Sequence, residues 1–144
     1  MKRILSFAVT VFIATFISGC SSVEPAKHMG NIPVESLKSA YVVLAPGADT
    51  TIAEFIQVGL AHHDLTVSVG ALRNKPKDVA FYVNYQDHWK WDLTMYLDSL
   101  DVQFIDNSND QVIASGSFRQ GLFHNFPDPR TTTFEVIDSI YNTK

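Results

Sequence analysis

The sequence predicts an α+β fold: a two-layer sandwich with two helices on one face of a mostly antiparallel sheet of about six strands. Apolar and polar residues alternate along several short segments between residues 65 and 118, and polar turn residues separate these segments. Apolar residues recur at helical spacing in one segment before this region and in one after it. The resulting order, β-α-β-β-β-β-β-α, is typical of a strand meander with helices packed against it.

The first predicted strand covers residues 40–44, which are β-branched and aromatic and are followed by a Pro-Gly pair. Thr51 and Glu54 then have the spacing of a capping box, which predicts the start of a helix. The apolar stripe of this helix consists of Ile52, Phe55, Ile56, Gly59, Leu60 and His63. Because the first strand joins the sheet through a helix, we expect one parallel strand pair within the antiparallel sheet.

Five more strands and a closing helix follow. The predicted strands cover residues 65–71, 79–85, 89–97, 100–104 and 112–118, and a polar loop at 106–110 joins the last two. Residues 132–135 form a second capping-box pattern, after which apolar residues continue at helical spacing to Tyr141. We find no internal repeat and no second domain.

The N-terminal segment has the features of a secretion signal. Lys2 and Arg3 precede an apolar run over residues 4–17, which is shorter than the ~20 residues of a membrane-spanning helix. Ile17-Ser18-Gly19-Cys20 follows, and this order resembles the bacterial lipobox. The resemblance implies cleavage before Cys20, a diacylglyceryl thioether on Cys20 and an acyl chain such as palmitate on its amine. The alternative is an ordinary signal peptide with a chance cysteine.

The chain is thus predicted to contain a lipoprotein signal peptide (1–19), a lipidated cysteine with a tether (20–38) and one periplasmic α+β domain (39–144). Residues 21–38 contain two prolines, a glycine and no sustained period, which is typical of a tether. Alternatively, Ile32, Val34 and Leu37 form a short strand or turn. Since Ser21 rather than Asp follows Cys20, the lipobox resemblance implies the outer membrane, periplasmic face. Surface exposure stays open as an alternative.

The charge balance excludes one class of partner. Removal of Lys2 and Arg3 with the signal leaves a formal net charge of −6, without the basic face that a nucleic-acid binder needs. The same balance argues against electrostatic adhesion to anionic lipid, so membrane attachment is expected to come from the lipid on Cys20. Cys20 is the only cysteine, so no disulfide is expected.

No motif for catalysis appears in the sequence. It contains no nucleophile elbow, Walker loop, dinucleotide fingerprint or paired-cysteine metal motif, so we predict no catalytic residue, no cofactor and no metal site. His88, Lys90, Asp92 and Tyr96 would share the wet face of the 89–97 strand, and they form the candidate binding surface. Trp89 and Trp91 would then lie on its dry face as core, the alternative being an exposed aromatic strip for a partner protein or sugar rings.

The segment from Tyr82 to Gly116 resembles a group of small proteobacterial envelope lipoproteins of uncharacterised function. The residues that carry this resemblance are Tyr85, Asp87, Trp89, Trp91, Asp92, Tyr96, Leu97, Asp106 and Gly116. The resemblance covers most of the domain and implies no activity.

Two functions remain open from the sequence. The first is a non-enzymatic binding or assembly module, tethered to the membrane, that holds an envelope protein partner. The alternative is an envelope hydrolase or metal-dependent enzyme that uses His88, Asp92 and nearby acids. The alternative requires these side chains to converge in a cleft.

Overall fold

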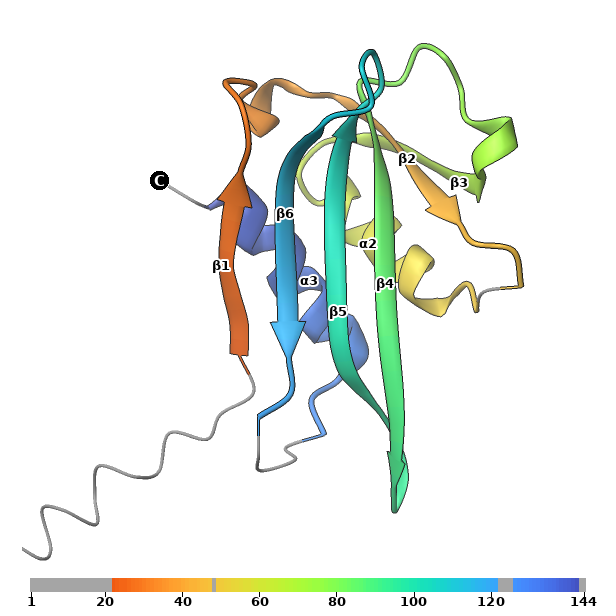
Figure 1. The fold of residues 1–144 in the computed structure, drawn as a ribbon, viewed down its shortest axis with the longest axis vertical. Helices are drawn as coiled ribbons and strands as arrows, with labels where there is room; N and C mark the ends of the chain where they lie inside the picture. Colours follow the sequence, from red (N-terminus) through yellow and green to blue (C-terminus); the bar gives the residue numbers. More distant parts are fainter. Residues whose placement is uncertain (1–21, 48, 122–125, 143–144) are drawn as a thin grey trace, which may run out of the picture.

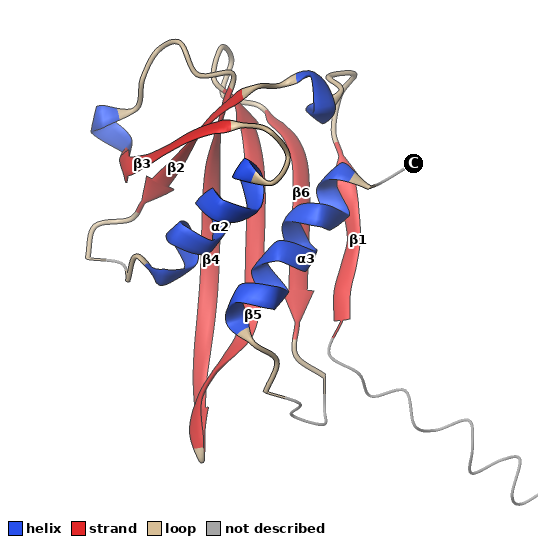
Figure 2. Ribbon diagram, turned by 180° about the vertical axis from the view of Figure 1, so that it is seen from behind, coloured by secondary structure: helices blue, strands red, loops and turns tan. Residues whose placement is uncertain are grey.

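The computed structural model describes residues 22–47, 49–121 and 126–142. In this part of the chain, six strands form one sheet with the order β1-β6-β5-β4-β2-β3. Helices α2 (Thr51–Ala61) and α3 (Pro129–Tyr141) both lie on the same face of this sheet (Figures 1 and 2). The predicted α+β sandwich with two helices on one face is therefore confirmed.

The strands differ greatly in length. They are β1 (Ser22–His28), β2 (Ser39–Leu44), β3 (Thr66–Ala71), β4 (Phe81–Asp92), β5 (Thr94–Asp106) and β6 (Val112–Arg119). The β1–β6, β6–β5 and β5–β4 pairs are antiparallel, whereas β2 is parallel to both of its neighbours, β3 and β4. The expected parallel pairing through a helix is thus present, and it involves two strand pairs.

The predicted tether is wrong for Ser22–His28, which form β1 at the edge of the sheet. This strand pairs with β6 from Ser22 opposite Arg119 to His28 opposite Ala114. Further along, the short 3-10 helix η1 (Val34–Ser36) buries Val34 completely. The sequence of β1 has no regular alternation that would predict a strand, because it contains Pro25 and a register shift between Glu24 and Lys27. An edge strand tolerates both a proline and a bulge.

Neither helix begins with the capping box that its sequence suggests. The N-cap of α2 is Thr50, and the amide of Thr51 donates to the Asp49 carboxylate over 2.7 Å. In α3 the N-cap is Asp128, which accepts from the Thr131 amide over 2.8 Å, with proline at the first helical position. Aspartate followed by proline is a competing start signal, and it places the N-cap of α3 four residues before Thr132, the N-cap of the predicted box.

The core lies between the helices and one face of the sheet. Alternate residues of the strands point into it, as the predicted alternation requires. Its large fully buried side chains are Phe81, Phe104, Ile52, Ile56, Leu60, Leu97, Leu100, Ile137, Ile140, Val34, Val42 and Val83. Gly116 on β6 allows α3 to approach closely, because a Cβ there would lie 3.0 Å from the Val136 carbonyl oxygen.

Histidines at the end of α2 connect the two helices. The Nε2 atom of His63 lies 2.7 Å from the Asp138 carboxylate on α3, and its ring stacks on Tyr141 at a centroid distance of 4.0 Å. His62 meets Phe134 edge to face. Both side chains therefore hold α2 against α3.

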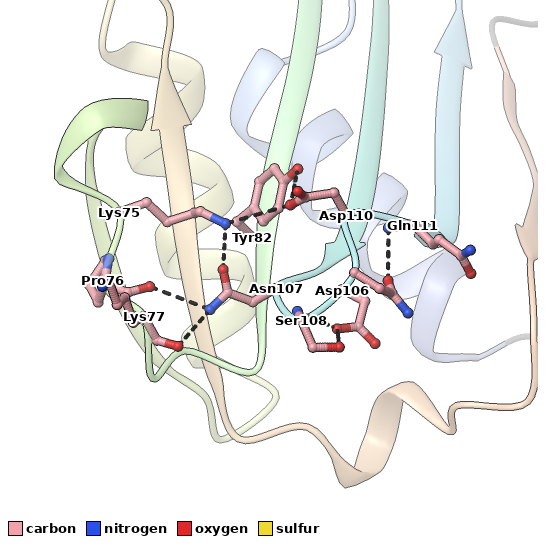
Figure 3. A network of polar contacts seen from close by, with 10 residues as sticks. Lys75, Pro76, Lys77, Tyr82, Asp106, Asn107, Ser108, Asp110 and Gln111 are labelled. Carbon is pink, nitrogen blue, oxygen red and sulfur yellow. Dashed lines mark hydrogen bonds and ion pairs between the residues drawn. The ribbon is translucent and has the colours of Figure 1, made fainter.

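A polar network fixes the connection between β3 and β4, which contains the short helix η2 (Leu72–Asn74), to the β5–β6 turn (Figure 3). Lys75 donates to the side chain of Asn107 and lies 4.0 Å above the ring of Tyr82. The Asn107 amide in turn donates to the Lys77 carbonyl over 3.0 Å, and the Tyr82 hydroxyl donates to Asp110. Three segments that are separate in the sequence are thereby joined at one end of the sheet.

Candidate interaction surfaces

A long β-hairpin projects beyond the rest of the sheet (Figures 1 and 2). Three predicted strands over 79–104 are merged into two, β4 and β5, because the chain reverses direction at Leu93. Leu93 has a positive φ of 60°, and its neighbours Asp92 and Thr94 face each other across the reversal. A leucine in this conformation gives no turn signal in the sequence, which is why the predicted 89–97 strand is wrong.

The two tryptophans have different environments. Trp89 is half-buried against the core, as predicted, and its indole N–H donates to Asp87 over 2.6 Å. Trp91 is 72% exposed, so the prediction that it belongs to the core is wrong. The two residues share a face of β4, but only Trp89 packs against the core, which does not extend as far as Trp91.

The end of the hairpin is apolar. Trp91 lies opposite Met95, which is 54% exposed, and Leu93 at the reversal is 90% exposed. Monomeric soluble proteins rarely leave several large apolar side chains exposed together, so this group, called the hairpin tip below, is a candidate interaction surface.

The predicted binding surface is only partly accessible. His88, Lys90 and Asp92 are exposed on β4, where Lys90 pairs with Asp98 over 3.0 Å. The hydrogen bond and the charge of Asp98 raise the pKa of Lys90 above its ordinary value. Tyr96, however, is only 5% exposed and packs edge to face against Phe126. Its inclusion in a wet face is wrong, because Phe126 covers the ring. Cys20 lies outside the described residues.

The acidic residues near the hairpins do not converge. Asp98 pairs with Lys90, Asp101 with Arg119, and Asp110 with Lys75. Within residues 22–47, 49–121 and 126–142, no three His, Cys, Asp or Glu side chains lie close enough together to hold a metal ion. The convergence that the enzyme hypothesis requires is therefore not found among His88, Asp92 and the nearby acids.

The face of the sheet opposite the helices carries a second candidate surface (Figure 1). Here a shallow groove of about 780 Å³ crosses β1, β6, β5 and β4. Its polar lining comes mainly from the residues that alternate with the core positions: Glu24, Asn84, Gln86, Asp101, Gln103, Ser115, Ser117 and Arg119. The sequence reasoning missed this surface, although the alternation on β4, β5 and β6 is the signal that could have identified it.

Charges of both signs line this groove. Arg119 donates two hydrogen bonds to the Asp101 carboxylate, at 2.7 and 3.0 Å. Ser117 donates to Glu24 on the adjacent edge strand over 2.9 Å. Lys27 also borders the groove. The surface suits a polar partner that itself presents both signs of charge.

No helix in the described part of the chain is long and apolar enough to span a membrane.

Comparisons with known proteins identify the fold. No protein-family model and no curated protein sequence matches the chain. Among solved structures, a point variant of the PelC dodecamer from Paraburkholderia phytofirmans is similar, with a TM-score of 0.58 and 16% identity over 83% of this chain and 95% of PelC. A second PelC dodecamer structure from that organism gives a TM-score of 0.57 at 15% identity, covering 83% of this chain and 94% of PelC.

A PDZ domain protein from Parabacteroides distasonis is also similar, with a TM-score of 0.51 and 10% identity. The match covers 93% of this chain but 38% of that protein. At these identities the likeness establishes a shared fold, and it extends over nearly the whole of the PelC chain.

Proposed function

We propose that this chain is a lipid-anchored, non-enzymatic assembly module of the bacterial envelope, whose copies associate through the open face of the sheet. The observation that carries the proposal is the arrangement of the two layers. Both helices cover one face, and the opposite face presents a polar groove contributed by several strands.

The groove has the chemistry of a surface that binds a second copy of itself. Glu24 and Asp101 supply negative charge, and Lys27 and Arg119 supply positive charge. A self-complementary contact needs both signs, because a surface of one sign would repel its own copy. Interfaces between folded proteins are about as polar as the remaining surface, so a polar lining is compatible with this role.

The comparison with PelC supports assembly rather than catalysis. PelC has this fold along 95% of its chain and was solved as a dodecamer. A fold that is already used in an oligomer has a shape compatible with side-by-side packing of copies. The likeness concerns the fold, and oligomer formation by this chain is the proposal.

The proposed location is the periplasmic face of the outer membrane. The lipobox pattern that ends at Cys20 supports a lipid anchor, and Ser21 after it supports transfer to the outer membrane. Two or more acyl chains hold a protein at a membrane stably, whereas one holds it only marginally. All copies would then be confined to one surface, which raises their effective concentration and favours association.

Photocrosslinking in intact cells tests self-assembly. A benzophenone amino acid replaces Gln103, which is exposed within the groove. We expect crosslinked products whose masses are multiples of the mass of the chain. The matched control replaces Asn109, which is exposed in the β5–β6 turn at the far end of the sheet, and should give monomer. Monomer alone from the Gln103 variant, or products containing only a different protein, would contradict self-assembly through the groove.

A further inference from the structure

The hairpin tip is apolar and projects at the same end of the molecule as the start of β1 (Figure 1). Leu93 and Trp91 are the two most exposed large apolar residues of the described chain, at 90% and 72%. An indole with one polar edge on an apolar ring is the side chain that most favours the boundary between lipid headgroups and acyl chains. The chemistry of the tip is therefore that of a membrane-contacting loop.

The strand register gives the distance along the strands between the tip and Ser22, the first residue of β1. Ser22 lies opposite Arg119, Arg119 opposite Ser99, and Ser99 opposite His88, so these residues form one row across the sheet. From His88 the hairpin continues for five residues to Leu93, which extends it by about 17 Å at ~3.4 Å per residue.

Strand β1 begins at the same end of the sheet as the tip. Strand β1 is antiparallel to β6, which is antiparallel to β5, so β1 and β5 run in the same direction, away from the tip. Cys20 precedes Ser22 by two residues, which reach at most about 7 Å. When the lipid on Cys20 is seated in the bilayer, the tip therefore extends at least about 10 Å beyond the level of Cys20, because Cys20 lies at most about 7 Å from the Ser22 row.

We propose that Trp91, Leu93 and Met95 insert into the headgroup boundary of the bilayer that holds the lipid on Cys20. This inference rests on the lipid anchor of the proposed function. An extension of at least about 10 Å is long enough for the tip to reach the ~5–10 Å depth at which interfacial protein segments are buried. Charged residues limit the depth, because Asp92 adjoins Leu93 and Lys90 lies three residues before it, about 10 Å away along the strand.

Membrane contact at the tip and the anchor would orient the whole domain. With the β4–β5 hairpin pointing into the bilayer, the long strands stand upright on the membrane, and the open face is directed sideways. The groove of one copy then faces its neighbours in the plane of the membrane. Two attachment points also remove the free rotation that a single flexible anchor permits, which lowers the entropic cost of association.

The experiment uses the lipoprotein purified from the envelope and reconstituted into vesicles of phosphatidylethanolamine and phosphatidylglycerol with brominated acyl chains. Bromine quenches indole fluorescence on contact. The chain has two tryptophans, so Trp89→Phe leaves Trp91 as the only reporter, and Trp91→Phe leaves Trp89. We expect blue-shifted emission from Trp91 and its loss in brominated vesicles, with unchanged emission from Trp89.

Two leucine variants in the Trp89→Phe background provide a matched pair. Leu93→Glu should restore water-like emission from Trp91, because it removes the most exposed apolar side chain of the tip and adds a second carboxylate beside Asp92. Leu72→Glu should leave the quenching unchanged, since Leu72 is 57% exposed on η2, at the β3 side of the sheet and away from the tip.

The outcomes test insertion of the tip and anchoring by the lipid on Cys20 independently. A chain that floats with the vesicles while Trp91 stays unquenched overturns tip insertion and leaves the anchor intact, the tip then being free for a protein partner. A chain that does not float overturns both. Quenching of Trp91 in a chain without fatty acid on Cys20 supports the tip and contradicts the anchor. Self-assembly is read separately, by the crosslink at Gln103.

Discussion

Gly116 lies on β6 where α3 crosses the strand, and replacing it with alanine tests the packing of the two layers. A Cβ at this position would lie 3.0 Å from the Val136 carbonyl oxygen and 3.1 Å from Cγ1 of Ile140, whereas ordinary contacts begin near 3.4 Å. One of these neighbours is backbone, so the helix itself must move. Overpacking of this kind costs about 1–3 kcal/mol.

The sign of the change in stability distinguishes Gly116 from a strand glycine that has free space around it. At a position with free space, glycine to alanine stabilises a protein by about 0.4–1 kcal/mol, because the unfolded chain loses freedom. For Gly116→Ala the packing cost outweighs this gain, and we expect a net loss of about 1–2 kcal/mol in the free energy of unfolding. For a domain of this size that corresponds to a fall of roughly 4–8 °C in Tm.

Urea denaturation followed by circular dichroism measures the change. The matched control is Ser115→Ala, one residue earlier on β6 and on the groove side, which should stay within about 0.5 kcal/mol of the natural chain. A Gly116→Ala variant that is as stable as the natural chain, or more stable, would show that α3 does not cross β6 at this point.

Three further predictions concern the tryptophans, the cap of α3 and sorting. Trp89→Ala should lower the free energy of unfolding by about 3 kcal/mol, because the indole packs against the core. Trp91→Ala should change it by less than about 0.5 kcal/mol, because Trp91 is exposed. Equal losses of stability in denaturation experiments would contradict the different environments. Asp128→Ala should cost about 0.5–2 kcal/mol at neutral pH through loss of the N-cap. The backbone hydrogen bond from Thr131 lowers the pKa of Asp128 below its ordinary 3.8. The stabilisation by the N-cap is therefore present above pH 3.8 and is lost as the pH falls through the lowered pKa. A stability difference between the two chains that persists in strong acid would argue against the cap. Ser21→Asp should shift the protein from the outer to the inner membrane in cell fractionation, and an unchanged distribution would mean that another signal controls location.

Much of the architecture is encoded locally and could be predicted. The α2 segment has a regular apolar stripe, and Ile52, Ile56 and Leu60 from it are fully buried as expected. The alternation in 112–118 likewise predicts β6, with Ala114 and Phe118 facing the core. These elements follow from periodicity because burial on one face imposes it.

The missed features depend on tertiary contacts. Strand β1 exists because β6 offers an edge to pair with, and few of its side chains enter the core. The reversal at Leu93 also has no signal in the sequence, because Leu93 lies within a run of alternating apolar residues. Its positive φ is fixed by the pairing of β4 with β5 and not by a residue type that favours turns. Alternation alone therefore shows that Trp89 and Trp91 share a face, but it does not show where the core beneath that face ends.

The lipid on Cys20 supports both the proposed function and the orientation of the hairpin tip, and mass spectrometry of the N-terminal peptide tests it most directly. The purified envelope protein is digested and the mass of its first peptide is measured. We predict that this peptide begins at Cys20 and carries a diacylglyceryl group with an additional acyl chain, and that Cys20→Ala abolishes both the cleavage and the lipid. An N-terminus at another residue, or an unmodified Cys20, would contradict the account.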